Sequence, residues 1–114
     1  MPDVTIYHNP RCATSRKTLA LLRQRGIEPR VVEYLKEPPD RATLKRLLTM
    51  LGLAPRALLR KKEAKEAGLD RPSLSDDQLI AGMERHPIVI ERPIVVKGDR
   101  AVLGRPPEAA LKLF

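Results

Sequence analysis

The sequence is poor in the residues that build disulfides, metal sites and aromatic stacking surfaces. Its 114 residues include one cysteine, two histidines, two tyrosines, one phenylalanine and no tryptophan. A single cysteine cannot form an internal disulfide, and one cysteine with two histidines matches no usual metal-ligand spacing. A chain of this length can still bury an aliphatic core in one domain. We therefore expect a fold that needs neither a disulfide nor a metal ion.

Long apolar runs are also missing. No stretch approaches the roughly 18 apolar residues that a membrane-spanning helix needs. The N-terminus lacks the basic segment and apolar run of a signal peptide. Together with the lone cysteine, these features predict a reducing, cytoplasmic location without membrane association.

Positive charge is in excess, with 22 basic and 14 acidic side chains and a formal net charge of +8. Such a balance attracts anions. Nucleic acid is the first candidate, but the few aromatic residues cannot form a base-stacking platform. The basic residues are spread along the chain and match no nucleic-acid-binding motif. We therefore expect a smaller anion as the partner, not nucleic acid.

The N-terminal third predicts a βαβ unit. The β-branched and aromatic run Val4–Tyr7 is typical of a buried strand. Leucines spaced among basic residues predict a helix over Ser15–Arg25, with Gly26 as its left-handed stop. Arg30–Tyr34 then predicts a second strand. Two strands joined by such a crossover are normally parallel.

The middle of the chain predicts helices. Asp40 follows two prolines and is a good N-cap, and Gly52 ends a helix with a leucine face. Pro55 can start another short helix. Ser75–Gln78 has the form of a capping box, which opens a helix that ends before a proline. The polar segment between these helices, Glu63–Pro72, is expected to be irregular or partly helical.

The C-terminal part predicts an antiparallel hairpin and a last helix. Ile94–Val96 and Ala101–Leu103 are apolar runs joined by the turn-forming pair Gly98-Asp99. The complete order, βαβ, helices, then ββα, predicts an α/β layered fold with a mixed four-stranded sheet flanked by helices. This is the thioredoxin-like order in a single domain, residues 1–114, with a helical insertion at about 40–86.

The single cysteine, Cys12, falls between the first predicted strand and helix. The unpaired N–H groups and the dipole of a helix N-terminus favour an anion there, either a thiolate or a bound oxyanion. A buried, inert cysteine is the alternative interpretation, but the neighbours in His8–Arg16 are polar and basic. A helix terminus contributes up to ~2 kcal/mol, about one and a half pKa units. His8 and Arg16 are neighbours that can add charge.

Two uses of a reactive cysteine do not fit the loop. Arg16 follows Cys12 too closely for the phosphatase-type spacing, and the loop contains no glycine. A thioredoxin-like dithiol needs a second cysteine, but position 15 is Ser15. Any disulfide of Cys12 must therefore form with another molecule. Ser15 has two open interpretations, a hydrogen bond to the thiolate or a helix cap.

Three different loops each carry an arginine at the end of a predicted helix or strand. These arginines are Arg60, Arg92 and Arg105. The rigid donor fork of arginine suits tetrahedral oxyanions. The alternative is solvated surface charge. Sequence spacing alone does not bring the three side chains together.

The run Tyr7–Leu19 resembles the active-site loop of the glutaredoxin-coupled arsenate reductases. Three further segments match this family in order: Arg56–Lys61, His86–Val95 and Gly104–Glu108. The resemblance covers nearly the whole chain, and it is the combination of segments that makes it specific.

This resemblance implies a thioredoxin-like fold with a helical insertion and assigns roles to individual residues. Cys12 corresponds to the nucleophile, and His8 to the histidine that supports its thiolate. Pro93 corresponds to a proline that is often cis in this fold. The family's arsenate-binding arginines correspond to Arg60, Arg92 and Arg105.

The resemblance also implies a mechanism of arsenic detoxification. The Cys12 thiolate attacks arsenate with loss of water, glutathione attacks the adduct, and glutaredoxin resolves the mixed species so that arsenite leaves. Glutathione is then a co-substrate, and no metal or bound organic cofactor takes part. The single cysteine agrees with this scheme, because both further thiols must come from outside.

Two other functions stay open. A glutathione-dependent thiol oxidoreductase of the same fold would keep Cys12 and would not need the three arginines together. A redox regulator that binds RNA polymerase belongs to another branch of the superfamily. That branch uses a two-cysteine switch, and Ser15 stands where its second cysteine would be.

Overall fold

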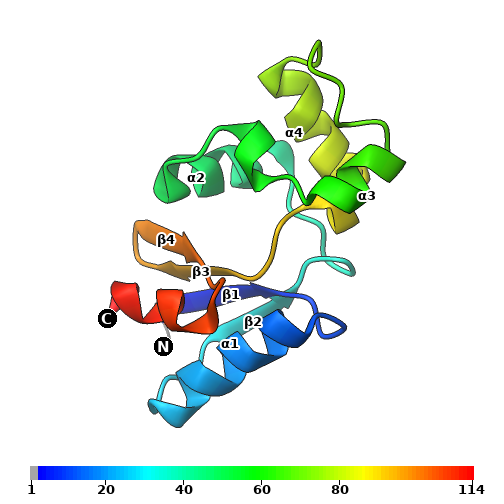
Figure 1. Ribbon diagram of the computed structural model, residues 1–114. Coiled ribbons are helices and arrows are strands. Elements are labelled where there is room, and N and C mark those ends of the chain that lie inside the picture. The colour runs from blue at the N-terminus through cyan, green and yellow to red at the C-terminus, as the bar shows by residue number, and fades with distance from the viewer. Residues whose placement is uncertain (1–2) are drawn as a thin grey trace. The chain divides into compact units, whose positions relative to one another are not determined.

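The computed structural model describes residues 3–114 (Figure 1). The elements, with 3₁₀ helices labelled η, are β1 (Val4–His8), α1 (Ala13–Gln24), β2 (Arg30–Glu33), α2 (Arg41–Leu51), η1 (Pro55–Leu58), α3 (Lys61–Glu66), α4 (Asp76–Arg85), η2 (Pro87–Val89), β3 (Ile94–Lys97), β4 (Arg100–Leu103) and η3 (Pro107–Leu113). They form two compact units. The sheet unit contains the described residues up to Glu37 and Arg92–Phe114, and the helical unit is Pro38–Glu91. The predicted insertion lies within the helical unit.

The sheet unit contains four strands in the order β2-β1-β3-β4. β1 and β2 are parallel, and β3 runs antiparallel to both β1 and β4. Gly98, with φ of 61°, makes the turn of the β3–β4 hairpin. The predicted mixed four-stranded sheet is confirmed. Because β1 and β2 are parallel, with His8 opposite Glu33, their carboxyl ends lie at the same edge.

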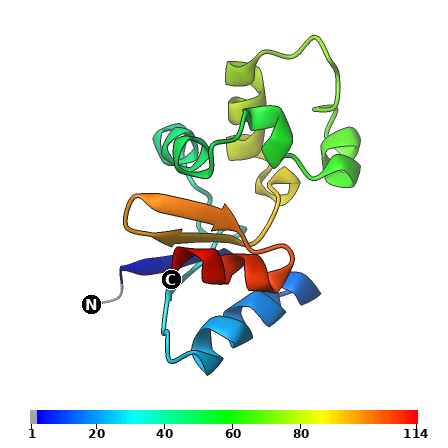
Figure 2. The same cartoon turned by 60° about the vertical axis from the view of Figure 1, so that its left-hand side comes forward.

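One face of this sheet holds the core of the unit. Ile6 and Val95 pack with Leu22 of α1 and Leu113 of η3 in one buried apolar cluster. Figures 1 and 2 both show α1 and η3 on the same side of the sheet. Helix α1 begins two residues earlier than predicted, and the predicted C-terminal helix is a 3₁₀ helix.

The helical unit follows its local sequence signals. The Asp40 carboxylate accepts a hydrogen bond from the Thr43 N–H at 2.8 Å, and Gly52 ends α2 with φ of 68°. Ser75 and Gln78 form the predicted capping box at the start of α4. The segment expected to be irregular or partly helical contains the end of α3. Leu59 and Ile90 form an isolated antiparallel bridge, which ties the segments after η1 and η2 together.

Candidate active site

Cys12 lies at the start of α1, as the sequence predicts, and it is the N-cap residue of this helix because α1 begins earlier than expected. Its backbone is extended, with φ of −93° and ψ of 120°, and its carbonyl accepts the Arg16 N–H at 3.0 Å. Its own N–H donates to the Asn9 carbonyl, also at 3.0 Å. The thiol is half-buried and free of any disulfide. The first-turn N–H groups of α1 therefore face a reactive sulfur that solvent can still reach.

The pKa of the Cys12 thiol lies below its ordinary value. Burial on its own raises this pKa, but hydrogen bonds to the thiolate outweigh burial. The backbone N–H of Ser15 contributes most among them, and that of Thr14 adds to it. The side chains of Arg92 and Arg105 supply the remaining hydrogen bonds. The loop backbone and two distant arginines together favour the nucleophilic form of the thiol.

Arg92 and Arg105 reach Cys12 because β3 lies between β1 and β4. Arg92 comes just before β3, and Arg105 just after β4. Arg105 Nη1 lies 3.8 Å from Cys12 Sγ and donates to the Arg92 carbonyl at 3.1 Å. Arg92 is only 6% exposed. The sheet thus brings together two of the three arginines that the sequence singled out.

Both arginines precede prolines in cis peptide bonds. The Arg92–Pro93 bond is cis, as the resemblance led us to expect. The Arg105–Pro106 bond is cis as well, which the sequence analysis did not predict.

Gly104 is a site residue that sequence reasoning missed. Its N–H donates to the Pro93 carbonyl at 2.9 Å, and its carbonyl accepts from Thr18 Oγ1 at 2.9 Å. A Cβ at this position would lie 2.7 Å from Thr18 Cγ2 and 3.0 Å from Pro93 Cγ. Helix α1 and the Pro93 loop therefore press directly on the backbone that precedes Arg105. Its position before Arg105 was the only available signal in the sequence.

His8 and Ser15 lie beneath the loop and contact each other. His8 is 6% exposed, and its Nδ1 lies 2.6 Å from Ser15 Oγ. Ser15 Oγ also accepts the Asn9 N–H at 3.1 Å. Burial lowers the pKa of His8, and the carboxylate of Glu33 opposes this shift. His8 therefore contacts the side chain of Ser15, and its burial disfavours a positive charge on the imidazole.

The structure gives the contacts of the other polar residues in the loop. Arg16 donates to the Pro10 carbonyl at 2.8 Å, and the charge at the thiol comes instead from the two distant arginines. Ser15 supports the thiolate through its backbone N–H, while its side chain contacts His8. The N-cap position of α1 has no side-chain hydrogen bond.

Arg60 lies in the helical unit, at the N-cap of α3. Its Nε is 3.1 Å from a Glu63 oxygen, and its Nη1 is 3.3 Å from a Glu91 oxygen. Burial on its own lowers the pKa of this guanidinium. The interactions with the two carboxylates together outweigh burial, so the pKa lies above its ordinary value. The Arg60 N–H donates to the Val89 carbonyl at 2.7 Å. Arg60 is therefore a fixed, fully charged donor within its unit.

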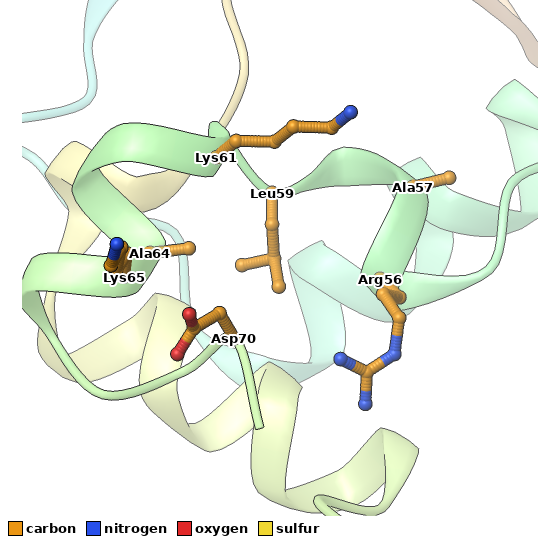
Figure 3. A pocket seen from close by; sticks show the side chains of 7 residues that line it. All are labelled: Arg56, Ala57, Leu59, Lys61, Ala64, Lys65 and Asp70. Carbon is orange, nitrogen blue, oxygen red and sulfur yellow. The ribbon is translucent and has the colours of Figure 1, made fainter. Parts of the chain in front are cut away.

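The helical unit also contains a cavity of about 440 Å³. Figure 3 shows Leu59 projecting between Arg56 on one side and Asp70 on the other. The Arg56 guanidinium donates to the carbonyls of Arg71 and Leu74, so its charge already has a structural use. The residues that line this cavity do not include Arg60.

Two kinds of feature are absent from residues 3–114. This range contains no cluster of three or more histidine, cysteine, aspartate or glutamate side chains that could hold a metal ion. It also contains no helix with both the length and the apolar character needed to cross a bilayer.

Fold and site together define a thioredoxin-like α/β protein whose thiolate lies at a helix N-terminus beside two arginines. Comparison with known proteins identifies the family within this class. The chain belongs to the ArsC family, whose family model matches residues 7–113.

Similar proteins cover nearly all of the chain. An arsenate reductase of Rhizobium meliloti is 51% identical over 113 residues, which span 97% of this chain and 81% of the relative. YfgD of Escherichia coli strain K12, whose name states no activity, is 51% identical over 97% of this chain and 96% of its own. The solved structure of an arsenate reductase from Vibrio cholerae superposes with a TM-score of 0.93, with 51% identity over 97% of both chains.

Proposed function

We propose that this protein is an arsenate reductase in which Cys12 is the nucleophile. The observation that carries the proposal is the approach of Arg92 and Arg105 to the Cys12 sulfur. Guanidinium groups pair with the oxygens of a tetrahedral oxyanion, and a thiolate can attack the arsenic atom that those oxygens surround. The names of the relatives support arsenate as the oxyanion.

The first step joins two negatively charged groups, and the arginines offset their repulsion. The Cys12 thiolate forms an S–As bond, and one arsenate oxygen leaves as water after taking up protons. Arg60 is proposed as the third arsenate ligand. Its contacts with Glu63 and Glu91 use Nε and Nη1, which leaves Nη2 without a partner among residues 3–114. A guanidinium has five N–H donors, so Arg60 can keep both glutamates and still bind an oxyanion.

Two thiols from outside must complete the reaction, because the chain has one cysteine. Glutathione attacks the arsenic–cysteine adduct, and glutaredoxin resolves the mixed species. In total, arsenate and two thiols give arsenite, one disulfide and water. Arsenic gains two electrons and the two sulfurs lose them.

A coupled assay tests this proposal. NADPH oxidation is followed with glutathione, glutaredoxin and glutathione reductase, and arsenate is added last. We expect oxidation to accelerate with arsenate and to depend on Cys12. If the rate stays unchanged with arsenate while small disulfides are reduced, the proposal is wrong and the thiol oxidoreductase alternative replaces it. A polymerase-binding regulator would give neither activity and would instead retain RNA polymerase in a pull-down.

A further inference from the structure

Thr18 is a fully buried polar residue in the second turn of α1. The residue is 0% exposed, although threonine is a residue of the surface in most proteins. A threonine inside a helix often returns its hydroxyl to the carbonyl four residues earlier, and Thr18 Oγ1 donates in this way to the Thr14 carbonyl at 2.9 Å. The same oxygen lies 2.9 Å from the carbonyl of Gly104, which is 86 residues away in the chain. Thr18 therefore connects the helix of the reactive sulfur to a distant segment.

The single hydroxyl proton of Thr18 faces two acceptors, and it is the Gly104 carbonyl that depends on it. The Thr14 carbonyl belongs to α1, whose backbone N–H groups supply its donor. Gly104 is buried just after β4, and Thr18 Oγ1 is the one donor to its carbonyl among residues 3–114. A buried carbonyl that loses its donor is costly. The hydroxyl of Thr18 thus satisfies a backbone group that no other side chain of the described range reaches.

Gly104 joins the segments that form the site. Its N–H donates to the Pro93 carbonyl at 2.9 Å, and its carbonyl accepts from α1, the helix that Cys12 caps. The next residue is Arg105, whose Nη1 lies 3.8 Å from Cys12 Sγ. Both branches of the Thr18 side chain lie against Gly104, because a Cβ there would be 2.7 Å from Cγ2 and 3.1 Å from Oγ1. The backbone before Arg105 is therefore held from two sides, and Thr18 supplies the side that faces the sulfur's own helix.

We propose that Thr18 is a positioning residue for Arg105. Its hydroxyl fastens the Gly104 carbonyl to α1 and so keeps the guanidinium of the next residue at the Cys12 sulfur. Arg105 itself is exposed, and an exposed side chain keeps a precise place only when the residues that support it are fixed. Thr18 acts through Gly104, on the sulfur and on any oxyanion bound beside it. That this oxyanion is arsenate rests on the proposed function.

Three variants separate the hydroxyl of Thr18 from its methyl group. Thr18→Val keeps the branched shape and removes the hydroxyl, Thr18→Ser keeps the hydroxyl and removes the methyl group, and Thr18→Ala removes both. The readout is the rate of iodoacetamide alkylation against pH, because Cys12 is the only cysteine. We expect the midpoint to rise by about half a unit in Thr18→Val and Thr18→Ala, part of the roughly one unit that a single charge at the sulfur provides.

Thr18→Ser should keep the wild-type midpoint, because it retains the donor to Gly104. If Thr18→Val does not fold, the comparison of Thr18→Ser with Thr18→Ala decides the question, since both lack the methyl group. An unchanged midpoint in the variants without the hydroxyl, or an equal rise in Thr18→Ser, would overturn the inference.

A double-mutant cycle with Arg105→Gln tests whether Thr18 acts through Arg105. In the Arg105→Gln background, Thr18→Val should not raise the midpoint further, and an additional rise of the same size would overturn the inference. Thr49 provides the matched control, because its Oγ1 donates to the Lys45 carbonyl at 3.0 Å and to no second acceptor in the described range. Thr49→Val removes the same type of helical hydrogen bond and should leave the midpoint in place.

The coupled assay adds a readout that a loss of stability alone would not give. We expect Thr18→Val to raise the KM for arsenate about threefold and to leave the KM for glutathione unchanged, because only the oxyanion contacts depend on Arg105. An equal rise of both values would contradict a positioning role. The alkylation curves involve no arsenate, so a wild type without arsenate turnover would contradict the proposed function, while the midpoints would still decide the role of Thr18.

Discussion

Replacing Arg105 by glutamine isolates the effect of one charge on the thiol. The substitution removes the guanidinium whose Nη1 lies 3.8 Å from Cys12 Sγ, and it keeps a polar side chain. At this separation, two unit charges interact by about 1 kcal/mol in water and about 4 kcal/mol at an effective dielectric constant of 20. Arg105 is exposed and Cys12 is half-buried. The lower end of this range therefore applies, and it corresponds to roughly one pKa unit.

The direction of the shift follows from the sign of the charge. A cation beside the sulfur stabilises the thiolate, so its removal raises the pKa of Cys12. The rate of alkylation by iodoacetamide follows the thiolate fraction, and Cys12 is the only cysteine that can react. In Arg105→Gln, we expect the midpoint of the rate-against-pH curve to move upward by about one unit.

Two controls make the measurement decisive. Arg25→Gln removes an exposed positive charge away from the site and should leave the midpoint in place. Arg105→Lys keeps a charge but loses the donor fork, so it should restore most of the pKa while still weakening arsenate binding. An unchanged midpoint in Arg105→Gln, or an equal shift in Arg25→Gln, would refute the assignment of Arg105 as a thiolate-stabilising group.

Three further substitutions test other parts of the site. Cys12→Ser should abolish arsenate reduction and leave the circular dichroism spectrum unchanged; substantial remaining turnover would exclude Cys12 as the nucleophile. Because the folded-state pKa of Cys12 is lowered, its thiolate stabilises the fold above the unfolded-state pKa, and this stabilisation is lost as pH falls through the folded-state pKa. The difference between wild type and Cys12→Ser in the free energy of urea unfolding should therefore grow with rising pH, and a constant difference would contradict the lowered pKa. Arg60→Ala should weaken arsenate binding more than Lys62→Ala, whereas equal effects in a titration would indicate general electrostatics. Gly104→Ala should destabilise the protein by about 1–3 kcal/mol in urea, because its Cβ would overlap Thr18; wild-type stability would show that the neighbours yield freely.

Local structure was predictable where one or two residues determine it. Asp40 and Ser75 cap helices through their own side chains, and Gly26 and Gly98 adopt the positive φ expected of them. These signals depend on a few neighbouring residues, so the sequence carries them directly. They were sufficient for the order of strands and helices and for the place of Cys12 at a helix start.

The site itself depends on contacts between distant segments. Arg92 and Arg105 reach Cys12 only because β3 pairs with β1 and β4 with β3. Spacing along the chain does not reveal this pairing. The two arginines were identified as site residues from the family resemblance instead. The lowered pKa of His8 follows from burial, which the polar loop sequence does not indicate. Gly104 has no functional group that could have marked it as part of the site.

Gly104 also bears on how this site can be redesigned. A mutational scan confined to charged and reactive residues would identify Arg105 and overlook the residue that positions it. A variant library aimed at a different oxyanion should therefore hold position 104 constant while position 105 is diversified, since a Cβ at position 104 would overlap Thr18. In such a library, position 105 varies the group beside the Cys12 sulfur, and the constant glycine keeps the close packing with Thr18 and Pro93.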